Sequence, residues 1–396
     1  MIRELGYACL GVTLCASAAS AQTTLDSTNL DGESSATVAT SPAAWVYVSS
    51  RLAGGSVNEI EAFDAAPNGK LTVIAGSPFH ENVTSMAVNG KYLVAVNSNR
   101  FDIDSYLLES NGALKYAATT NASQPGDCNS LGSLVFDHTG ATLYDMEFRG
   151  SGCDNNTFES FAVHRPTGGL NALGNSSANN WLELPVSFIG NNVYAYTASC
   201  LEDMDWGIFG FQRSSDGLLT EIKNAGVPPT PPTGDFYCPS QAAADPTDHV
   251  AITMQPVNQQ TFNPDKPPQL ATYTADANGH LSTTSTAANM PTTEVVSVTD
   301  IAMSPSGKLI AVGGTGGLQI FHFNGASPIT HYTGLLTTDE VDQFFWDNEN
   351  HLYAISTATN KLRVYTITPT GYSEAPGSPH TVNSPHDIIV QTLPRY

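Results

Sequence analysis

Short apolar runs alternate with polar, glycine-rich turns from residue 45 to the end of the chain. The most apolar runs are four to seven residues long, which is the usual length of a β-strand, and they begin 43–60 residues apart. Strands with small side chains, such as 85–88 and 241–244, precede most of them. The seven apolar runs cover residues 45–48, 92–96, 142–148, 193–196, 249–254, 309–312 and 352–355.

A hairpin signal repeats after the apolar runs. An aromatic residue precedes a turn glycine by six positions, or by seven in one case, and the residue before the glycine is usually Asn, Asp or Thr. Asn-Gly and Asp-Gly tolerate the positive φ of a tight hairpin, so each pair predicts a third and a fourth strand. Four strands repeated seven times predict a seven-bladed β-propeller with four-stranded blades. The pairs are Phe63 and Gly69, Tyr106 and Gly112, Phe161 and Gly168, Phe211 and Gly217, Tyr273 and Gly279, and Tyr365 and Gly371.

The two ends of the repeat region are complementary. The first unit begins at Trp45 with its second strand, whereas an unpaired apolar strand, 387–391, remains at the C-terminus. Pairing this strand with the first unit, so that Ile388 and Ile389 lie beside Tyr47, would satisfy both open edges and close the ring. A pair of β-sandwiches would leave the last strand unexplained.

Composition agrees with an all-β chain and restricts its partners. Only 13% of the residues are charged, and the net charge is −22. Such a surface repels phosphate backbones and anionic lipid headgroups, so we expect no nucleic-acid partner. A local positive site for a small anion remains compatible with this charge.

The N-terminus predicts export. An apolar stretch after Arg3 and the small residues 19–21 form a secretory signal peptide, residues 1–21. A flexible Ser/Thr-rich leader follows at 22–43, and the propeller covers 44–396. No later apolar stretch is long enough to span a membrane. We therefore expect a secreted or periplasmic protein, and a monomer.

Four cysteines remain after the signal peptide, and export favours disulfides over metal thiolates. If the inner strands begin at one face, Cys128 and Cys153 fall together there, and so do Cys200 and Cys238. We predict these two disulfides, each contributing roughly 3–4 kcal/mol of stability.

Three arginines recur in register at the same face. Arg51, Arg100 and Arg149 end the second strands of the first three units at intervals of 49 residues. Because the ends of equivalent second strands on neighbouring blades are expected to lie roughly 10 Å apart, these side chains could converge on one carboxylate or phosphate. The alternative is surface charge that pairs with Asp or Glu.

Candidate acids and bases lie at this face as well. Glu147 lies on the same strand face as Arg149, because the two are two residues apart. His386 enters the closing strand and is the histidine best placed to reach the axis, and His80 is second. Asp300, Asp342 and Asp387 stand at or near the starts of inner strands, where they could bind calcium, act as acid and base, or be hydrated rim residues. No metal-ligand spacing, nucleophile elbow, phosphate loop or dinucleotide motif is present, so we expect no metal and no cofactor.

Several turns resemble those of the lactonase family of seven-bladed propellers. Residues 304–309, Ser-Pro-Ser-Gly-Lys-Leu, are similar to its Ser-Pro-Asp-Gly-Lys turn, and Gly-Ser-Pro at 76–78 and 377–379 is also typical of it. The resemblance implies relatives that hydrolyse 6-phosphogluconolactone or close muconate lactones, and exported members without an established activity. Of the family's channel-mouth residues, only Pro385-His386 has a counterpart here.

Three functions follow as hypotheses. In a lactone hydrolase, Arg51, Arg100 and Arg149 would hold the substrate anion and polarise the carbonyl, and Glu147 or His386 would activate water. The alternative is a non-catalytic propeller that presents its rim to a glycan or to another exported protein. A calcium-stabilised structural module is the third.

Overall fold

The fold is taken from a computed structural model that describes residues 41–394 except 53–54, 56, 98–101, 123–131, 147–156, 178–184, 201–205 and 265. All described residues belong to one compact unit, Thr40–Tyr396. The predicted disulfide partners Cys128 and Cys153 lie outside the described residues.

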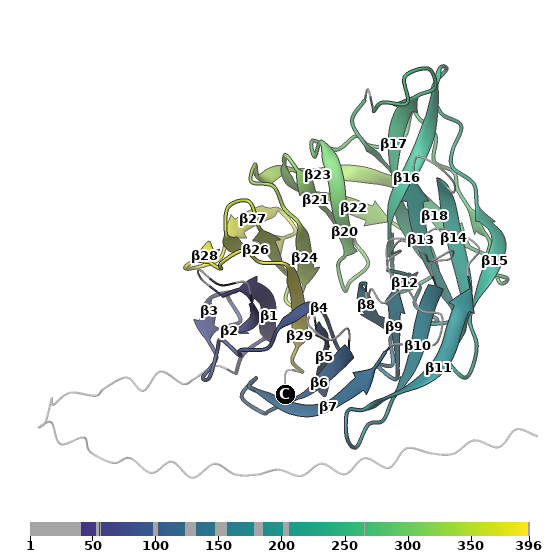
Figure 1. The fold of residues 1–396 in the computed structure, drawn as a ribbon. Coiled ribbons are helices and arrows are strands. Elements are labelled where there is room, and N and C mark those ends of the chain that lie inside the picture. Colours follow the sequence, from purple (N-terminus) through teal and green to yellow (C-terminus); the bar gives the residue numbers. More distant parts are fainter. Residues whose placement is uncertain are drawn as a thin grey trace, which may run out of the picture. The chain divides into compact units, whose positions relative to one another are not determined.

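The described part of this compact unit consists of seven antiparallel sheets, the blades of a β-propeller (Figure 1). Each blade has a path of four strands that follow one another in the sequence, except that the innermost strand of blade 1 is the last strand of the chain, and the first strand of each path lies nearest the axis. Blade 1 consists of β29 (Asp387–Thr392), β1 (Ala44–Arg51), β2 (Asn58–Ala65) and β3 (Leu71–Val73), and blade 2 of β4 (Val83–Val88), β5 (Tyr92–Asn97), β6 (Asp102–Leu108) and β7 (Leu114–Asn121). Blade 3 consists of β8 (Leu134–Phe136), β9 (Thr142–Met146), β10 (Thr157–Val163) and β11 (Leu170–Ser177), and blade 4 of β12 (Ser187–Phe188), β13 (Tyr194–Cys200), β14 (Trp206–Arg213) and β15 (Leu219–Gly226).

The remaining three blades follow the same order. Blade 7 carries a short fifth strand, β28 (His380–Thr381), which pairs with β26 beyond the end of β27. Blade 5 consists of β16 (Asp235–Ala244), β17 (His249–Asn258), β18 (Gln269–Ala275) and β19 (Leu281–Ser282). Blade 6 consists of β20 (Ser297–Met303), β21 (Leu309–Thr315), β22 (Gly317–Asn324) and β23 (Ser327–Thr337). Blade 7 consists of β24 (Gln343–Trp346), β25 (His351–Ser356), β26 (Lys361–Thr368) and β27 (Gly371–Glu374).

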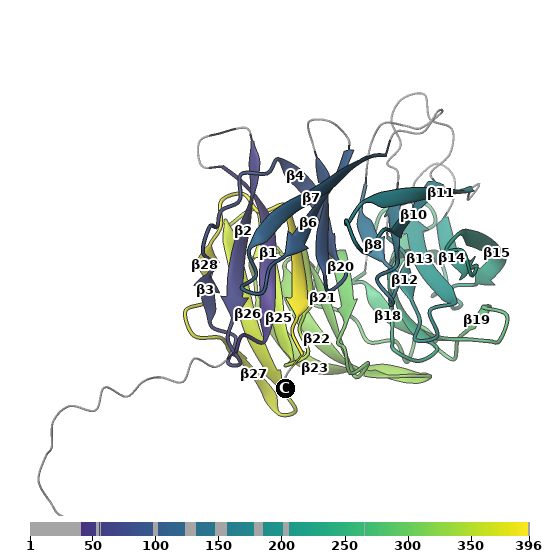
Figure 2. The same ribbon diagram turned by 90° about the horizontal axis from the view of Figure 1, so that it is seen from below.

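The strands of the blades run between two faces of the propeller (Figure 2). We call the face where the inner strands β4, β8, β12, β16, β20, β24 and β29 begin the mouth, and the opposite face the floor. Every second strand therefore ends at the mouth, as expected from the sequence. Among the described residues, no helix has the length and the apolar character needed to cross a membrane.

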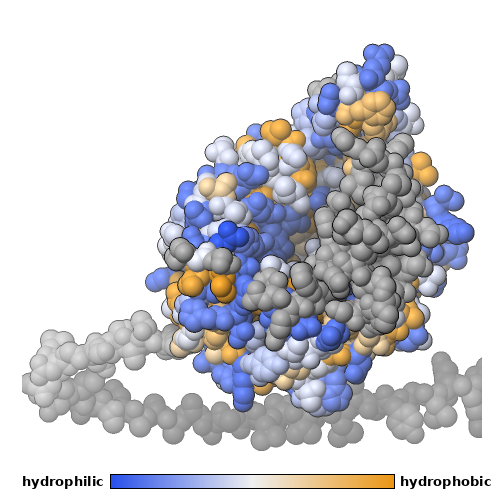
Figure 3. All heavy atoms as spheres, viewed as in Figure 1, coloured by the Kyte–Doolittle hydropathy of each residue, from blue (hydrophilic) through white to orange (hydrophobic). Residues whose placement is uncertain are grey.

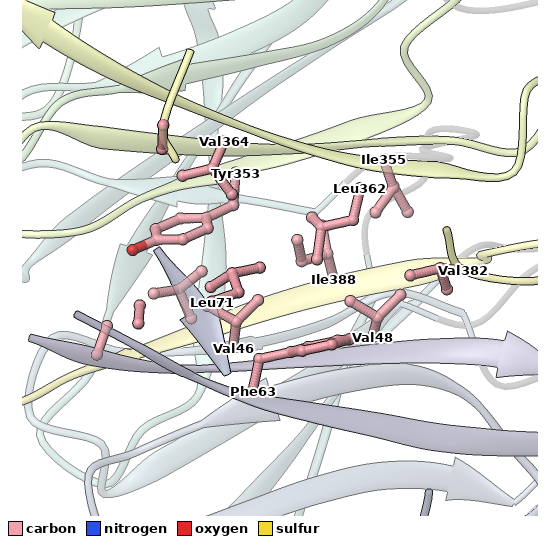
Figure 4. Packing of buried hydrophobic residues seen from close by; sticks show 14 residues of the cluster. Val46, Val48, Phe63, Leu71, Tyr353, Ile355, Leu362, Val364, Val382 and Ile388 are labelled. Atoms are coloured by element: carbon pink, nitrogen blue, oxygen red, sulfur yellow. The ribbon is translucent and has the colours of Figure 1, made fainter. Parts of the chain in front are cut away.

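Ring closure follows the prediction. β29 pairs antiparallel with β1, and Ile389 lies opposite Tyr47. Ile388 is fully buried between blades 1 and 7, with Val46 and Val48 on one side and Tyr353 and Leu362 on the other (Figure 4). The last strand thus contributes both ladder hydrogen bonds and apolar burial to the joint between the first and last blades.

The repeated hairpin signal has a packing role that the sequence did not reveal. Tyrosines in second strands donate hydrogen bonds to the carbonyl of the turn glycine of the next blade. Tyr196 Oη lies 2.9 Å from Gly279 O, and this glycine has φ +81°. A Cβ at Gly279 would lie 2.6 Å from the Tyr194 ring, so the turn needs glycine for both backbone and contact. The equivalent bonds join Tyr47 to Gly112 and Tyr144 to Gly217.

Blade 6 and blade 5 depart from the pattern expected from the sequence. In blade 6, Phe321 occupies the buried aromatic position and Gly325 forms the turn only four residues later, which is why the six-residue spacing does not identify this hairpin. In blade 5, β16 begins at Asp235, six residues before the predicted strand, and a register shift between Pro239 and Ala242 interrupts its pairing with β17.

Candidate functional site

The axis of the propeller holds a cavity of 610 Å³ at the mouth, and all seven blades contribute residues to its wall. A second cavity of 330 Å³ shares seven of these residues. Its other lining residues come later in the inner strands and so lie nearer the floor. We call the seven shared residues the belt. They are Ser85, Ser133, Pro185, Gln241, Asp300, Gln343 and Asp387.

Belt side chains connect neighbouring inner strands. Gln343 Oε1 accepts a hydrogen bond from the N–H of Ile388 at 2.9 Å, and Asp387 Oδ2 accepts one from the N–H of Met86. Ser85 Oγ accepts the N–H of Leu134 at 3.2 Å. Inner strands of adjacent blades share no β-ladder, so these side chains satisfy backbone donors that would otherwise lie at open edges.

The two belt carboxyl groups have strongly shifted pKa values. Burial is the main cause, and it raises the pKa of Asp387 to about 7, with the nearby charge of Asp300 adding to the effect. Burial likewise raises the pKa of Asp300 to about 7, although backbone hydrogen bonds from Phe344 and Ile301 oppose the shift. Both groups therefore change protonation near neutral pH, and at pH 6 both are mainly uncharged.

His386 stands at the mouth immediately before β29. Its backbone N–H donates to Ser49 O at 2.7 Å, which ties it to the second strand of blade 1. Burial and the positive charge of Arg51 lower the pKa of the His386 imidazole, and the charge of Asp342 partly opposes them. The imidazole is therefore neutral at pH 7 and able to accept a proton.

Asp342 and His386 are positioned through one residue of blade 7. Thr357 donates its N–H to Asp342 Oδ2 at 2.7 Å and its hydroxyl to Pro385 O at 2.6 Å. Because Pro385 directly precedes His386, the threonine holds the carboxylate and the histidine backbone in one arrangement.

The structure brings several sequence-predicted residues to one place. Arg51, His386, Asp300, Asp342 and Asp387 all line the mouth cavity. Arg51 is exposed at the end of β1, with its backbone bonded to Asn383.

Other predictions have a different outcome. His80, the second candidate histidine, is not among the residues that line the mouth cavity. Its side chain is 73% exposed, and its Nδ1 lies 3.2 Å from Glu59 Oε2. Glu147, Arg100 and Arg149 lie outside the described residues, so their convergence with Arg51 stays a prediction. Cys200 at the end of β13 is bonded to Cys238 in β16, which is the predicted pair, and it links blades 4 and 5.

The sequence reasoning missed the uncharged members of the belt. Gln343, Gln241 and Ser85 give no chemical signal of their own, and only their position on an inner strand relates them to Asp300 and Asp387. No group of three or more His, Cys, Asp or Glu side chains in the described ranges is arranged as a metal site. The predicted absence of a metal and a cofactor stays a prediction.

The mouth combines one exposed cation, a neutral imidazole and carboxyl groups around a hollow of ligand size. Hydrophilic residues gather toward the middle of the face shown in Figure 3. Such a set can bind a small polar or anionic ligand and can accept a proton from a bound water.

Solved structures show the same fold at low sequence identity. A candidate 6-phosphogluconolactonase from Bacteroides fragilis is 15% identical, with a TM-score of 0.62 over 91% of this chain and 99% of its own. A second candidate 6-phosphogluconolactonase, from Bacteroides uniformis, is 14% identical, with a TM-score of 0.62 over 88% and 99%. A hypothetical selenium-binding protein from Sulfolobus tokodaii is 10% identical, with a TM-score of 0.62 over 89% and 94%.

These identities establish the propeller fold alone, and the differing descriptions show that the fold does not select one function. No protein-family model matches the chain, and no curated protein sequence matches it.

Proposed function

We propose that this protein is an exported lactonase-like propeller that hydrolyses a lactone of a sugar acid, or a similar anionic substrate, at its mouth. The observation that carries the proposal is the convergence of Arg51, His386 and Asp342 on one cavity of 610 Å³. The likeness to two candidate 6-phosphogluconolactonases supports it at the level of the fold.

The roles follow from the chemistry of these groups. Arg51 holds the substrate anion or the lactone carbonyl oxygen, where negative charge develops. Neutral His386 accepts a proton as the oxygen of water bonds to the carbonyl carbon. When the ring C–O bond breaks, the imidazolium returns this proton to the departing oxygen, which yields a hydroxy acid from lactone and water alone. Asp342 favours the imidazolium by its charge.

Three further residues belong to the proposal on sequence grounds. Arg100 and Arg149 are expected to extend the anion site that Arg51 begins, and Glu147 is the alternative base. Export is proposed from the signal-peptide pattern, and the Cys200–Cys238 disulfide supports it because disulfides persist in oxidising compartments.

The test is hydrolysis of a panel of sugar lactones by the purified protein, followed as acid release at constant pH. We expect Arg51→Ala and His386→Gln each to lower kcat/KM by about tenfold or more. Arg165→Ala is the matched control, because Arg165 is exposed in the β10–β11 turn at the floor. Equal rates for the wild type and both mouth variants would rule the proposal out.

A non-catalytic binding propeller is the second candidate, because the belt side chains are engaged in holding inner strands together, as a rigid platform requires. Its partner would be a glycan or another exported protein. Saturable binding of a lactone or a glycan without acid release would favour this function over hydrolysis.

A further inference from the structure

The axial channel changes character below the belt. Val135, Ala302 and Phe345 follow Ser133, Asp300 and Gln343 by two residues on β8, β20 and β24. Because side chains alternate along a strand, residues two apart lie on the same side of it. All six residues line the 330 Å³ cavity. A polar level at the belt is thus followed by an apolar level.

The apolar level presents surface that the protein does not cover. Val135, Ala302 and Phe345 are only partly buried, whereas Leu134, Ile301 and Phe344, which point between the blades, are buried. Part of each of the first three side chains packs against a core cluster between blades, and all three also line the 330 Å³ cavity.

The polar groups at this depth are largely engaged within the protein. Ser187 Oγ accepts the N–H of Ala244 at 2.9 Å, so this serine serves the joint between blades 4 and 5. Ala242, Ala243 and Ala244 add only methyl groups to the same wall. A ligand that reached this level would gain contact with the carbon atoms of these side chains.

We propose that the lower channel binds a short aliphatic chain, so that the ligand is a lactone or hydroxy acid with an alkyl substituent whose polar head stays at the mouth. This deepens the proposed function and rests on it for the reaction, but not for the binding. The belt is compatible with passage of the ligand's alkyl chain, because the carboxyl groups of Asp300 and Asp387 are largely uncharged in mildly acidic solution.

The first experiment measures binding without requiring catalysis. Straight-chain carboxylates from acetate to octanoate are titrated into the full-length protein at pH 6 by calorimetry. We expect affinity to rise about two- to fourfold per methylene until the channel is filled, because each buried methylene is worth about 0.8 kcal/mol at most. Equal affinity along the series, or no binding of any member, would overturn the proposal.

Two variants connect this chain-length effect with the lower channel. Ala302→Leu fills the cavity and is expected to reduce octanoate affinity at least tenfold while acetate binding is kept. Ala277→Leu makes the same change in an exposed turn and should behave as the wild type. If Ala302→Leu does not fold, Val135→Thr keeps the volume, adds a hydroxyl to the wall and should reduce the gain per methylene. A variant at either position that binds octanoate like the wild type would contradict the assignment.

The second experiment separates this inference from the proposed reaction. Hydrolysis of γ-octalactone is compared with that of γ-butyrolactone, and a higher kcat/KM for the alkyl lactone is expected, with the preference lost in Ala302→Leu. Chain-length-dependent carboxylate binding with no lactone hydrolysis would refute the reaction and leave the alkyl site standing. Hydrolysis of both lactones with no preference, and flat carboxylate binding, would refute the alkyl site alone.

Discussion

Replacing Asp387 by Asn tests whether a buried carboxyl group at the axis controls the pH dependence of stability. Asp387 is 7% exposed, and its folded-state pKa is about 7, against 3.8 for the free side chain. At pH values between these two pKa values, the folded protein therefore keeps a proton on Asp387 that the unfolded chain has released. Stability should fall as the pH rises from about 4 to about 7, and level off above it.

The size of the effect follows from the shift. A difference of about three pKa units corresponds to about 4 kcal/mol over the whole window, of which about 2–3 kcal/mol falls between pH 5 and pH 8. Asn cannot ionise, yet its carbonyl oxygen can still accept the hydrogen bond from the Met86 N–H. We therefore expect Asp387→Asn to lack about half of the fall in stability with rising pH that the two belt carboxyl groups cause.

The assay is urea unfolding of the wild type and Asp387→Asn at pH 5, 6, 7 and 8. The difference between the two proteins at each pH cancels the contributions of the other titrating groups. The variant should gain on the wild type as the pH rises, by about 2 kcal/mol or more at pH 8 relative to pH 5. Asp216→Asn, in an exposed turn, is the control and should change nothing in this window. A difference between wild type and Asp387→Asn that does not vary with pH would refute the reasoning.

Two further changes test the joints between blades. Tyr196→Phe leaves the buried carbonyl of Gly279 without its hydroxyl donor and should lower the free energy of unfolding in urea by about 1–2 kcal/mol. The control Tyr116→Phe, at an exposed position, should lower it by less than about 0.5 kcal/mol. Equal effects of the two changes would contradict the role of Tyr196. Replacing Cys200 and Cys238 together by Ser opens a loop with a sequence separation of 38 residues. Under oxidising conditions this change should lower the free energy of unfolding by about 3–4 kcal/mol. Unchanged stability would show that the disulfide does not restrain the chain.

Sequence alone determined the number of blades, their four strands and the closing partner of the first blade. The blades and their strands depend on interactions between residues close together in the chain, whereas the closing partner followed from the two open edges left at the ends of the repeat region. An aromatic residue and a turn glycine six positions later, such as Tyr273 and Gly279, are enough to specify a hairpin. Six such pairs together with the seven apolar runs specify the ring. The Cys200–Cys238 pair followed from the same register. Where the local signal was shorter, as at Phe321 and Gly325, the hairpin was not identified although the strands around it were.

The candidate site was only partly readable in this way. The repeat placed Arg51, His386 and the aspartates at one face, but the belt and the apolar level beneath it depend on how inner strands of different blades lean toward the axis. Met86 and Asp387, whose hydrogen bond helps to close the belt, are 301 residues apart in the chain. The pKa of Asp387 depends on burial that exists only after the ring has closed. Tertiary structure alone decided these properties, because no local stretch of sequence contains the groups that produce them.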